Sequence, residues 1–417
     1  MTAEQLRLMF VVLPLGCLLV LTAVLRVVPA LWDATVGPMD RGRNQTIDGT
    51  RGLLALWVIT HHLDVGPEMV KAGGIWNPPE STLVVIMQTG FFIAPFFALT
   101  ALIFGGHLLR TKGELSTLSF VKKRAFRLLP TYFLSVLLIF VTAFAMTGLE
   151  LRVTVLKLAT QIVRWSLLDF VPRYDINAVD VSKAHGMLWS LRLELIFYLL
   201  LPGLAFLQRR FRSPAPLFLG LAAASLVNSI FVFFLAGLVT AAVLGWTGLR
   251  FKLAWQLATV GAVTLIIVLA DNHSRIVQAV LLIPIMVALV QEGAVFAALR
   301  WRPLRFVGEI SYSVYILHYP LIWILFSALI APDWAQQLPY EHRMLLNIAL
   351  ASLIVAISTL SFVAVERPFV RLGRRITAAH FGAQAPWRRP RAVLLSPGQS
   401  AAAAAVDDPA HRPEPTK

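Results

Sequence analysis

One apolar stretch of the sequence, DGTRGLLALWVITHHLDVG at 48–66, contains an arginine and two histidines. If this stretch is an α-helix, Arg51 and His62 lie within about 20° of one face and ~16 Å apart along the axis, whereas His61 lies about 80° away. Arginine binds phosphates, and histidine can abstract a proton at neutral pH. The spacing therefore favours a ligand with a phosphate-rich head and a long arm that ends in a reactive group.

Each of these residues also has a purely structural explanation. His62 could bond to a neighbouring carbonyl group, and Arg51 could anchor the helix end at the membrane surface. However, ionisable groups deep in a membrane are costly, and in helical bundles they usually face a functional cavity. An acyl-coenzyme A fits the pair well, because its phosphates would meet Arg51 and its thioester would reach His62, the expected general base. Asp48 is the expected N-cap of this helix.

The composition places these residues in a membrane protein. Of the 417 residues, 58% are hydrophobic and only 14% are charged, whereas about a quarter are charged in a soluble domain. We divide the long run 215–247 near Asn228 and expect eleven spans in an all-α polytopic transmembrane helix bundle. The apolar stretches are 7–30, 52–66, 83–108, 130–148, 187–207, 215–230, 231–247, 253–270, 276–291, 308–331 and 344–365.

Basic residues are concentrated in every second loop, which predicts the orientation of the chain. Lysine and arginine favour the cytosolic side, so we expect the N-terminus outside and the C-terminus in the cytosol. The net charge of +15 is explained by this asymmetry and by attraction to membrane lipids, and no nucleic acid is expected as a partner. The single cysteine, Cys17, excludes an internal disulfide and a zinc site built on paired cysteines, and we expect no metal.

Three segments outside the core carry their own expectations. Residues 1–45 are an extra N-terminal span with a polar cytosolic linker at 31–47. Residues 149–186 form the longest outside segment, whose stretch LRVTVLKLATQIVRWSLL is amphipathic and suited to the membrane surface. Residues 373–417 are rich in alanine, proline and arginine and are expected to be a disordered basic tail.

Six motifs in order resemble those of the membrane acyltransferase-3 family. They are DGTRGLLALWVITHH (48–62), FVKKRAFRLLPTY (120–132), HGMLWSLRLELIFYLLLP (185–202), SIFVFFLAGLVTA (229–241), FVGEISYSVYILHYPLI (306–322) and VERPF (365–369). The resemblance implies a ten-helix acyltransferase-3-like core at 46–372, with the first span as an addition. It implies an O-acyltransferase of the bacterial inner membrane that moves an acyl group, often acetyl, from cytosolic acyl-CoA to a carbohydrate or other hydroxyl acceptor at the outer face.

The other candidate site residues are chosen by their expected depth in the membrane and by their place in these motifs. Glu194 and His62 can meet near mid-membrane, where a carboxylate would support the base, although Glu194 could instead pair with a buried arginine. Arg124 and Arg127, three residues apart, could hold phosphates of the CoA or simply set the topology. The remaining candidates are His318 and Trp189, which aromatic packing would also explain, and Glu366, which lies level with Arg51.

The sequence departs from the family pattern in one helix and leaves another function class open. FFALTAL has Thr100 and Ala101 where family members commonly have Ser-Gly, so a helix contact or a pocket hydroxyl is altered. A proton-coupled carrier of an organic solute or lipid-linked sugar is the alternative function. We find no internal repeat that would favour it. A structural scaffold is disfavoured by the register of Arg51 and His62. The sequence does not indicate the acceptor, the length of the acyl group or the oligomeric state.

Overall fold

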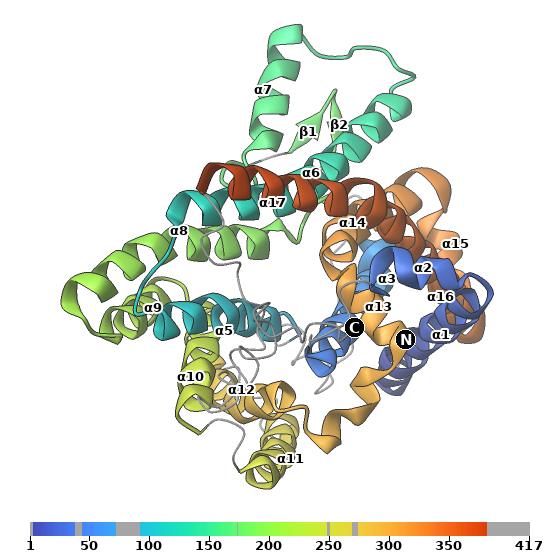
Figure 1. Ribbon diagram of the computed structural model, residues 1–417. Coiled ribbons are helices and arrows are strands. Elements are labelled where there is room, and N and C mark those ends of the chain that lie inside the picture. The colour runs from blue at the N-terminus through green and yellow to red at the C-terminus, as the bar shows by residue number, and fades with distance from the viewer. Residues whose placement is uncertain are drawn as a thin grey trace, which may run out of the picture.

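The protein is an all-α helical bundle (Figure 1). The structure is a computed structural model that describes residues 3–37, 44–71, 92–172, 174–247, 251–268 and 274–381. Within these residues, five helices are long and apolar enough to cross a membrane, or six if the bent pair Arg275–Val290 and Ala294–Arg300 is one span. Shorter apolar helices accompany them. The chain is therefore a multi-pass membrane protein, as its composition predicts.

The first half of the bundle contains the helix with the arginine and the two histidines. Its elements are α1 (Ala3–Val27), α2 (Pro29–Thr35), α3 (Gln45–Val70), α5 (Ala94–Arg110), α6 (Thr117–Met146), α7 (Val155–Ser166), β1 (Asp175–Ile176), β2 (Val179–Asp180) and α8 (Leu188–Phe211). The predicted apolar stretches of this half are helical in the described residues. The part of the stretch 83–108 that precedes residue 92 lies outside the described residues.

The second half confirms the predicted division of the run 215–247. Its elements are α9 (Ala215–Val227), α10 (Phe231–Thr247), α11 (Lys252–Val268), α12 (Arg275–Val290), η2 (Ala294–Arg300), α13 (Arg302–Glu309), α14 (Ser311–Ile324), η3 (Leu325–Leu329), α15 (Pro332–Gln337), α16 (Tyr340–Ser361), η4 (Phe362–Glu366) and α17 (Arg367–Phe381). Between α9 and α10, the Asn228 side chain accepts a hydrogen bond of 3.0 Å from the backbone N–H of Ile230. Such a local bond favours a turn over continued helix.

Helix α3 is fixed by very close contact with α13. A Cβ added at Gly52 would lie 2.0 Å from the carbonyl oxygen of Leu304, and one at Gly308 would lie 1.8 Å from that of Asp48. Small residues permit such backbone approach between membrane helices. Helix α3 also packs on α1, α14 and α16. Its level and rotation in the bundle are therefore set by backbone contacts.

The start of α3 differs from the prediction. The N-cap is Asn44, whose side-chain oxygen accepts a hydrogen bond of 2.9 Å from the backbone N–H of Ile47. Asp48 is instead a buried residue of the first helical turn, where its negative charge still favours the helix dipole. The assignment of Asp48 as the N-cap is wrong, because an earlier polar side chain caps the helix one turn before the apolar pattern begins.

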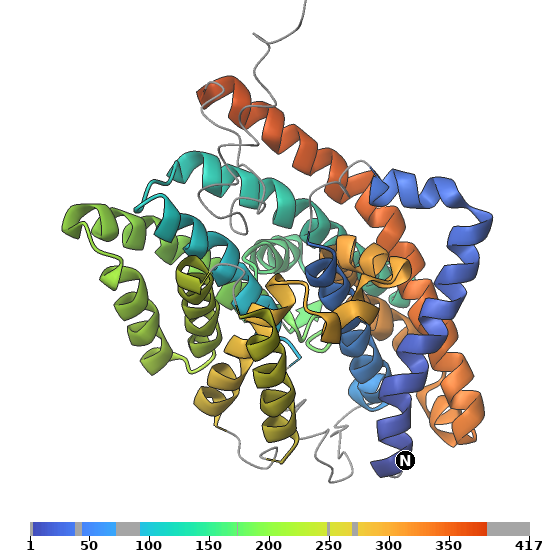
Figure 2. The ribbon, with the colours of Figure 1, turned by 60° about the horizontal axis from the view of Figure 1, so that its bottom comes forward.

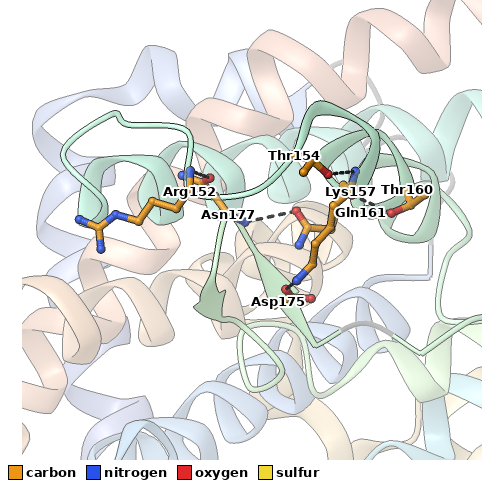
Figure 3. A network of polar contacts seen from close by, with 7 residues as sticks. All are labelled: Arg152, Thr154, Lys157, Thr160, Gln161, Asp175 and Asn177. Atoms are coloured by element: carbon orange, nitrogen blue, oxygen red, sulfur yellow. Dashed lines mark hydrogen bonds and ion pairs between the residues drawn. The ribbon is translucent and has the colours of Figure 1, made fainter.

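The predicted amphipathic stretch is α7, which lies beside a β-hairpin that the sequence pattern did not indicate (Figure 1). Gln161 and Trp165 are its buried side chains. The Gln161 side chain accepts a hydrogen bond of 3.2 Å from the N–H of Asn177, a residue with φ of 49° in the turn between β1 and β2 (Figure 3). Lys157 forms an ion pair of 3.0 Å with Asp175 and thereby lowers the pKa of that carboxyl group. These contacts fix α7 to the hairpin.

The N-terminal segment is an integral part of the bundle. Helix α1 packs on α3 and α16, and the linker that follows it begins with the short helix α2. Trp32 of α2 lies beneath two guanidinium groups of α13, at 4.6 Å for Arg302 and 5.4 Å for Arg305 from the ring centroid. Cation–π contacts of this kind stabilise packing. The extra N-terminal span is therefore attached directly to the helix that carries Arg51 and His62.

The C-terminal segment corrects one boundary. Helix α17 continues to Phe381 and packs on α6, so the expectation that disorder begins at residue 373 is wrong. A Cβ at Gly373 would lie 2.7 Å from Cβ of Phe126, and this close packing extends the helix beyond the last span. Residues 382–417 lie outside the described residues. Figure 2 shows the start of α1 at the bottom of the bundle and α17 along its top.

Candidate functional site

Two histidines that are 256 positions apart in the sequence meet inside the bundle. Nδ1 of His62 on α3 lies 3.2 Å from Nε2 of His318 on α14. The same Nδ1 lies 2.8 Å from the carbonyl oxygen of Val58. Nδ1 of His318 lies 3.0 Å from the carbonyl oxygen of Val314. Each carbonyl belongs to the preceding turn of the histidine's own helix, so helical geometry orients both rings.

These contacts assign the ring hydrogens. A carbonyl oxygen only accepts hydrogen bonds, so Nδ1 of each neutral histidine carries the hydrogen. Nε2 of His318 then presents a lone pair to the Nδ1–H of His62. The nitrogen of His62 that remains able to take up a proton is Nε2. His318 therefore occupies the orienting position that the sequence suggested for Glu194.

We define the histidine cluster as His61, His62, His318 and Tyr319. The ring of Tyr319 meets that of His62 edge-on, with centroids 4.9 Å apart and an interplanar angle of 68°. The His61 ring centroid also lies 4.9 Å from that of His62. His62 and Tyr319 are half-buried, whereas His318 has an exposed fraction of 0%. His62 and Tyr319 therefore keep some exposed surface, whereas His318 is fully enclosed.

The beginning of α8 forms a wall beside this cluster. The hydroxyl groups of Ser190 and Tyr315 share a hydrogen bond, and the Tyr315 hydroxyl lies 3.4 Å from the carbonyl oxygen of Met187. A Cβ at Gly186 would lie 2.6 Å from the hydroxyl oxygen of Tyr319. Sequence reasoning missed the roles of these residues. The available signal was the helical spacing of Tyr315 and Tyr319 around His318.

Glu194 is not brought to His62. Its Oε1 accepts a hydrogen bond from the hydroxyl group of Tyr198, one turn later on α8. The guanidinium carbon of Arg124 lies 4.8 Å from the ring centroid of Phe104 and 5.8 Å from that of Tyr198, and it interacts electrostatically with Glu194. This arrangement corresponds to the structural alternative for Glu194, in which it compensates a buried arginine.

Glu366 and Arg51 are brought together, as the sequence suggested. Glu366 has an exposed fraction of 2%, and its Oε2 accepts a hydrogen bond of 2.7 Å from the hydroxyl of Ser313. It interacts electrostatically with the guanidinium groups of Arg127 and Arg51. We define the arginine–glutamate cluster by its five members, which come from α3, α6, α8 and η4: Arg51, Arg124, Arg127, Glu194 and Glu366.

Trp189 takes part in aromatic packing, which is the structural explanation given for it from the sequence. Its ring centroid lies 6.5 Å from that of Phe97 on α5, and the side chain is half-buried.

Within the described residues, no group of three or more His, Cys, Asp or Glu side chains has the geometry to hold a metal ion, although three histidines belong to the histidine cluster. The arrangement is instead suited to proton transfer at His62 and to binding of anionic groups at the arginines.

A comparison with known protein families gave a match that covers most of the chain. The family model described as an acyltransferase domain of the acyltransferase-3 type matches residues 44–366, more than half of the chain. The matched range includes both clusters. A search of the curated proteins and a search of the solved structures gave no match.

Proposed function

Because the chain belongs to the acyltransferase-3 family and is a membrane acyltransferase, we propose that it moves an acyl group, most readily acetyl, from cytosolic acyl-CoA to a hydroxyl group of a carbohydrate or glycan precursor at the outer face of the bacterial inner membrane. The observation that carries the proposal is the geometry of His62. Its Nδ1 is hydrogen-bonded on the side of His318 and Val58, and its Nε2 remains for a substrate proton.

In the proposed reaction, Nε2 of His62 takes the proton of the acceptor hydroxyl while that oxygen attacks the thioester carbonyl carbon. The carbon–sulfur bond then breaks, and the imidazolium returns the proton to the departing thiolate. The products are an ester and CoA with a free thiol. Nε2 of His318 accepts the Nδ1–H of His62, which stabilises the imidazolium that forms during attack.

The arginine–glutamate cluster supports the donor half of the proposal. Arg51 and His62 are on one helix, with His62 further along it. A bound CoA would place its phosphates near Arg51 and Arg127 and extend its arm along α3 towards His62. Arg124 lies between aromatic rings and would contribute mainly to the field at this site. Basic residues in every second loop support a cytosolic position for this end of the bundle.

Transfer of radiolabelled acetyl from acetyl-CoA tests the proposal. Inner-membrane vesicles that contain the wild-type protein should transfer the label to carbohydrate as an ester that mild base releases, and vesicles with His62→Gln should not. Mass spectrometry of surface glycans from a deletion strain would then identify the acceptor by the lost acyl mass. Wild-type vesicles that take up a solute but transfer no label would instead indicate the carrier function.

A further inference from the structure

We propose that Tyr319 is a further catalytic residue, whose hydroxyl group donates a hydrogen bond to the oxyanion that forms when the acceptor attacks the thioester. This inference rests on the proposed acyl transfer and names the group that stabilises its transition state. Such donors usually contribute a large part of the rate enhancement of acyl transfer.

The position of Tyr319 is the first observation. The residue follows His318 on α14, and its ring meets the His62 ring edge-on with centroids 4.9 Å apart. Both side chains are half-buried, so each keeps surface that a ligand could contact. The base and the proposed donor are therefore direct neighbours.

The availability of its hydroxyl group is the second observation. Tyr312 on the same helix donates a hydrogen bond of 2.7 Å to the carbonyl oxygen of Leu128, and Tyr315 is bonded to Ser190. For Tyr319, the structure gives no hydrogen-bond acceptor among the described residues. A phenol hydroxyl inside a protein normally finds a partner. A substrate oxygen would supply this partner.

Gly186 is the third observation, because it makes room for this hydroxyl. A Cβ at this position would lie 2.6 Å from the hydroxyl oxygen of Tyr319 and 2.9 Å from its Cζ. A larger residue here would therefore force the hydroxyl end of Tyr319 to shift. The lack of a side chain at residue 186 leaves room for this hydroxyl group.

The chemical step is balanced without any additional reactant. Attack of the acceptor oxygen on the carbonyl carbon moves the carbonyl electron pair onto oxygen, and this oxyanion accepts the hydrogen bond from Tyr319. When the carbon–sulfur bond breaks, the carbonyl double bond forms again and the hydrogen bond weakens. Tyr319 keeps its proton throughout, whereas His62 carries the proton from the acceptor to the thiolate.

The experiment compares four forms of the full chain in lipid nanodiscs: wild type, Tyr319→Phe, Gly186→Ala and the double variant. Tyr319→Phe keeps the ring contact with His62 and should lower kcat for acetyl transfer by ~10²–10³-fold with little change in the KM for acetyl-CoA. Gly186→Ala should lower kcat in the wild-type background and add little in the Tyr319→Phe background, because both changes remove the same hydrogen bond. Tyr315→Phe is the matched control and should retain more activity.

A binding measurement separates catalysis from folding. The acceptor hydroxyl, or water in its place, adds to the ketone carbon of a trifluoromethyl ketone analogue of acetyl-CoA and gives a tetrahedral adduct whose former carbonyl oxygen is an oxyanion, whereas a thioether analogue has no carbonyl group. Tyr319→Phe should bind the first analogue at least tenfold more weakly and the second as well as wild type. If wild type transfers acetyl but Tyr319→Phe is equally active, or loses affinity for both analogues alike, the assignment of Tyr319 is overturned and acyl transfer stands. A wild-type protein that transfers no acetyl overturns both proposals.

Discussion

The two polar clusters of this bundle differ in how they hold charge. The histidine cluster contains three imidazoles, and the hydrogen bond between His62 and His318 joins two rings that can both be neutral. The arginine–glutamate cluster contains arginines and carboxylates, and each carboxylate interacts electrostatically with an arginine and accepts a hydrogen bond from a hydroxyl group. Burial penalises an uncompensated charge. Under the proposed function, the first cluster moves a proton during the reaction, whereas the second pairs opposite charges and meets the anionic donor.

The largest effect should follow loss of the base in the histidine cluster. A general base contributes ~10²–10⁴-fold to the rate, so His62→Ala should abolish measurable acetyl transfer while the protein remains monodisperse and binds CoA. His61→Ala should keep more activity, because His62 is the histidine that lies on the same face of α3 as Arg51 and has a hydrogen bond to His318 that leaves its Nε2 for the acceptor. The assay is transfer of radiolabelled acetyl in nanodiscs. If His62→Ala is active and His61→Ala is inactive, the assignment of His62 as the base is wrong.

The next largest effect on the rate should follow loss of His318, the neighbour of His62. His318→Leu removes the lone pair that accepts the Nδ1–H of His62 and should lower kcat by ~10–100-fold, as for other groups that orient a functional histidine. His318→Gln retains an acceptor oxygen and should recover part of that loss. The KM for acetyl-CoA should be nearly the same in both variants. Equal losses in the two variants would show that His318 only fills space.

The next prediction concerns the proposed binding of the acyl-CoA donor by Arg51, in the arginine–glutamate cluster. If its guanidinium meets CoA phosphates, Arg51→Ala should weaken acyl-CoA binding by roughly ten- to a hundredfold, because a charge-assisted contact contributes ~1.5–3 kcal/mol. Arg210→Ala, at an exposed position near the end of α8, is the matched control. Binding can be measured by calorimetry in detergent. Unchanged affinity together with lost activity would assign Arg51 to its structural interaction with Glu366.

The smallest effect on the rate should come from Glu194. Because its hydrogen bond leads to Tyr198, Glu194→Gln should lower the free energy of unfolding by ~1–3 kcal/mol and reduce kcat by less than about tenfold. Thermal unfolding and kcat should be measured together, with Glu341→Gln at an exposed position as the control. A large loss of kcat without a change in Tm would show that Glu194 supports the base, and the two clusters would then not have separate roles.

The sequence predicted the elements well because their signals are local. The turn between α9 and α10 depends on the side chain of Asn228, and the apolar run shows where each helix lies. Depth along a helix is also local, and Glu366 and Arg51, which were expected at one level, interact electrostatically. The start of α3 was misplaced by one turn because Asn44 and Asp48 are both residues that cap helices, and only the folded chain selects one.

Contacts between helices were harder to predict, because they depend on how each helix is rotated about its axis. Equal depth suggested that Glu194 meets His62, but Glu194 interacts electrostatically with Arg124 of α6 and accepts a hydrogen bond from Tyr198 of its own helix. The same uncertainty concealed the bond between His62 and His318. The role of Gly186 was also hidden, since its importance comes from the space beside Tyr319 and not from any group of its own.

The backbone contact between α3 and α13 has a mechanical consequence. With Gly52 against Leu304 and Gly308 against Asp48, a slide of one helix past the other would drive Cα and carbonyl atoms into each other. The contact with α13 should therefore hold α3, which carries His62, in place during turnover. Under the proposed function, we expect the motion that admits the acceptor and releases the ester to occur at the start of α8, near Gly186 and Ser190. A cross-link between α3 and α13 should leave turnover intact, whereas one between α3 and the start of α8 should stop it.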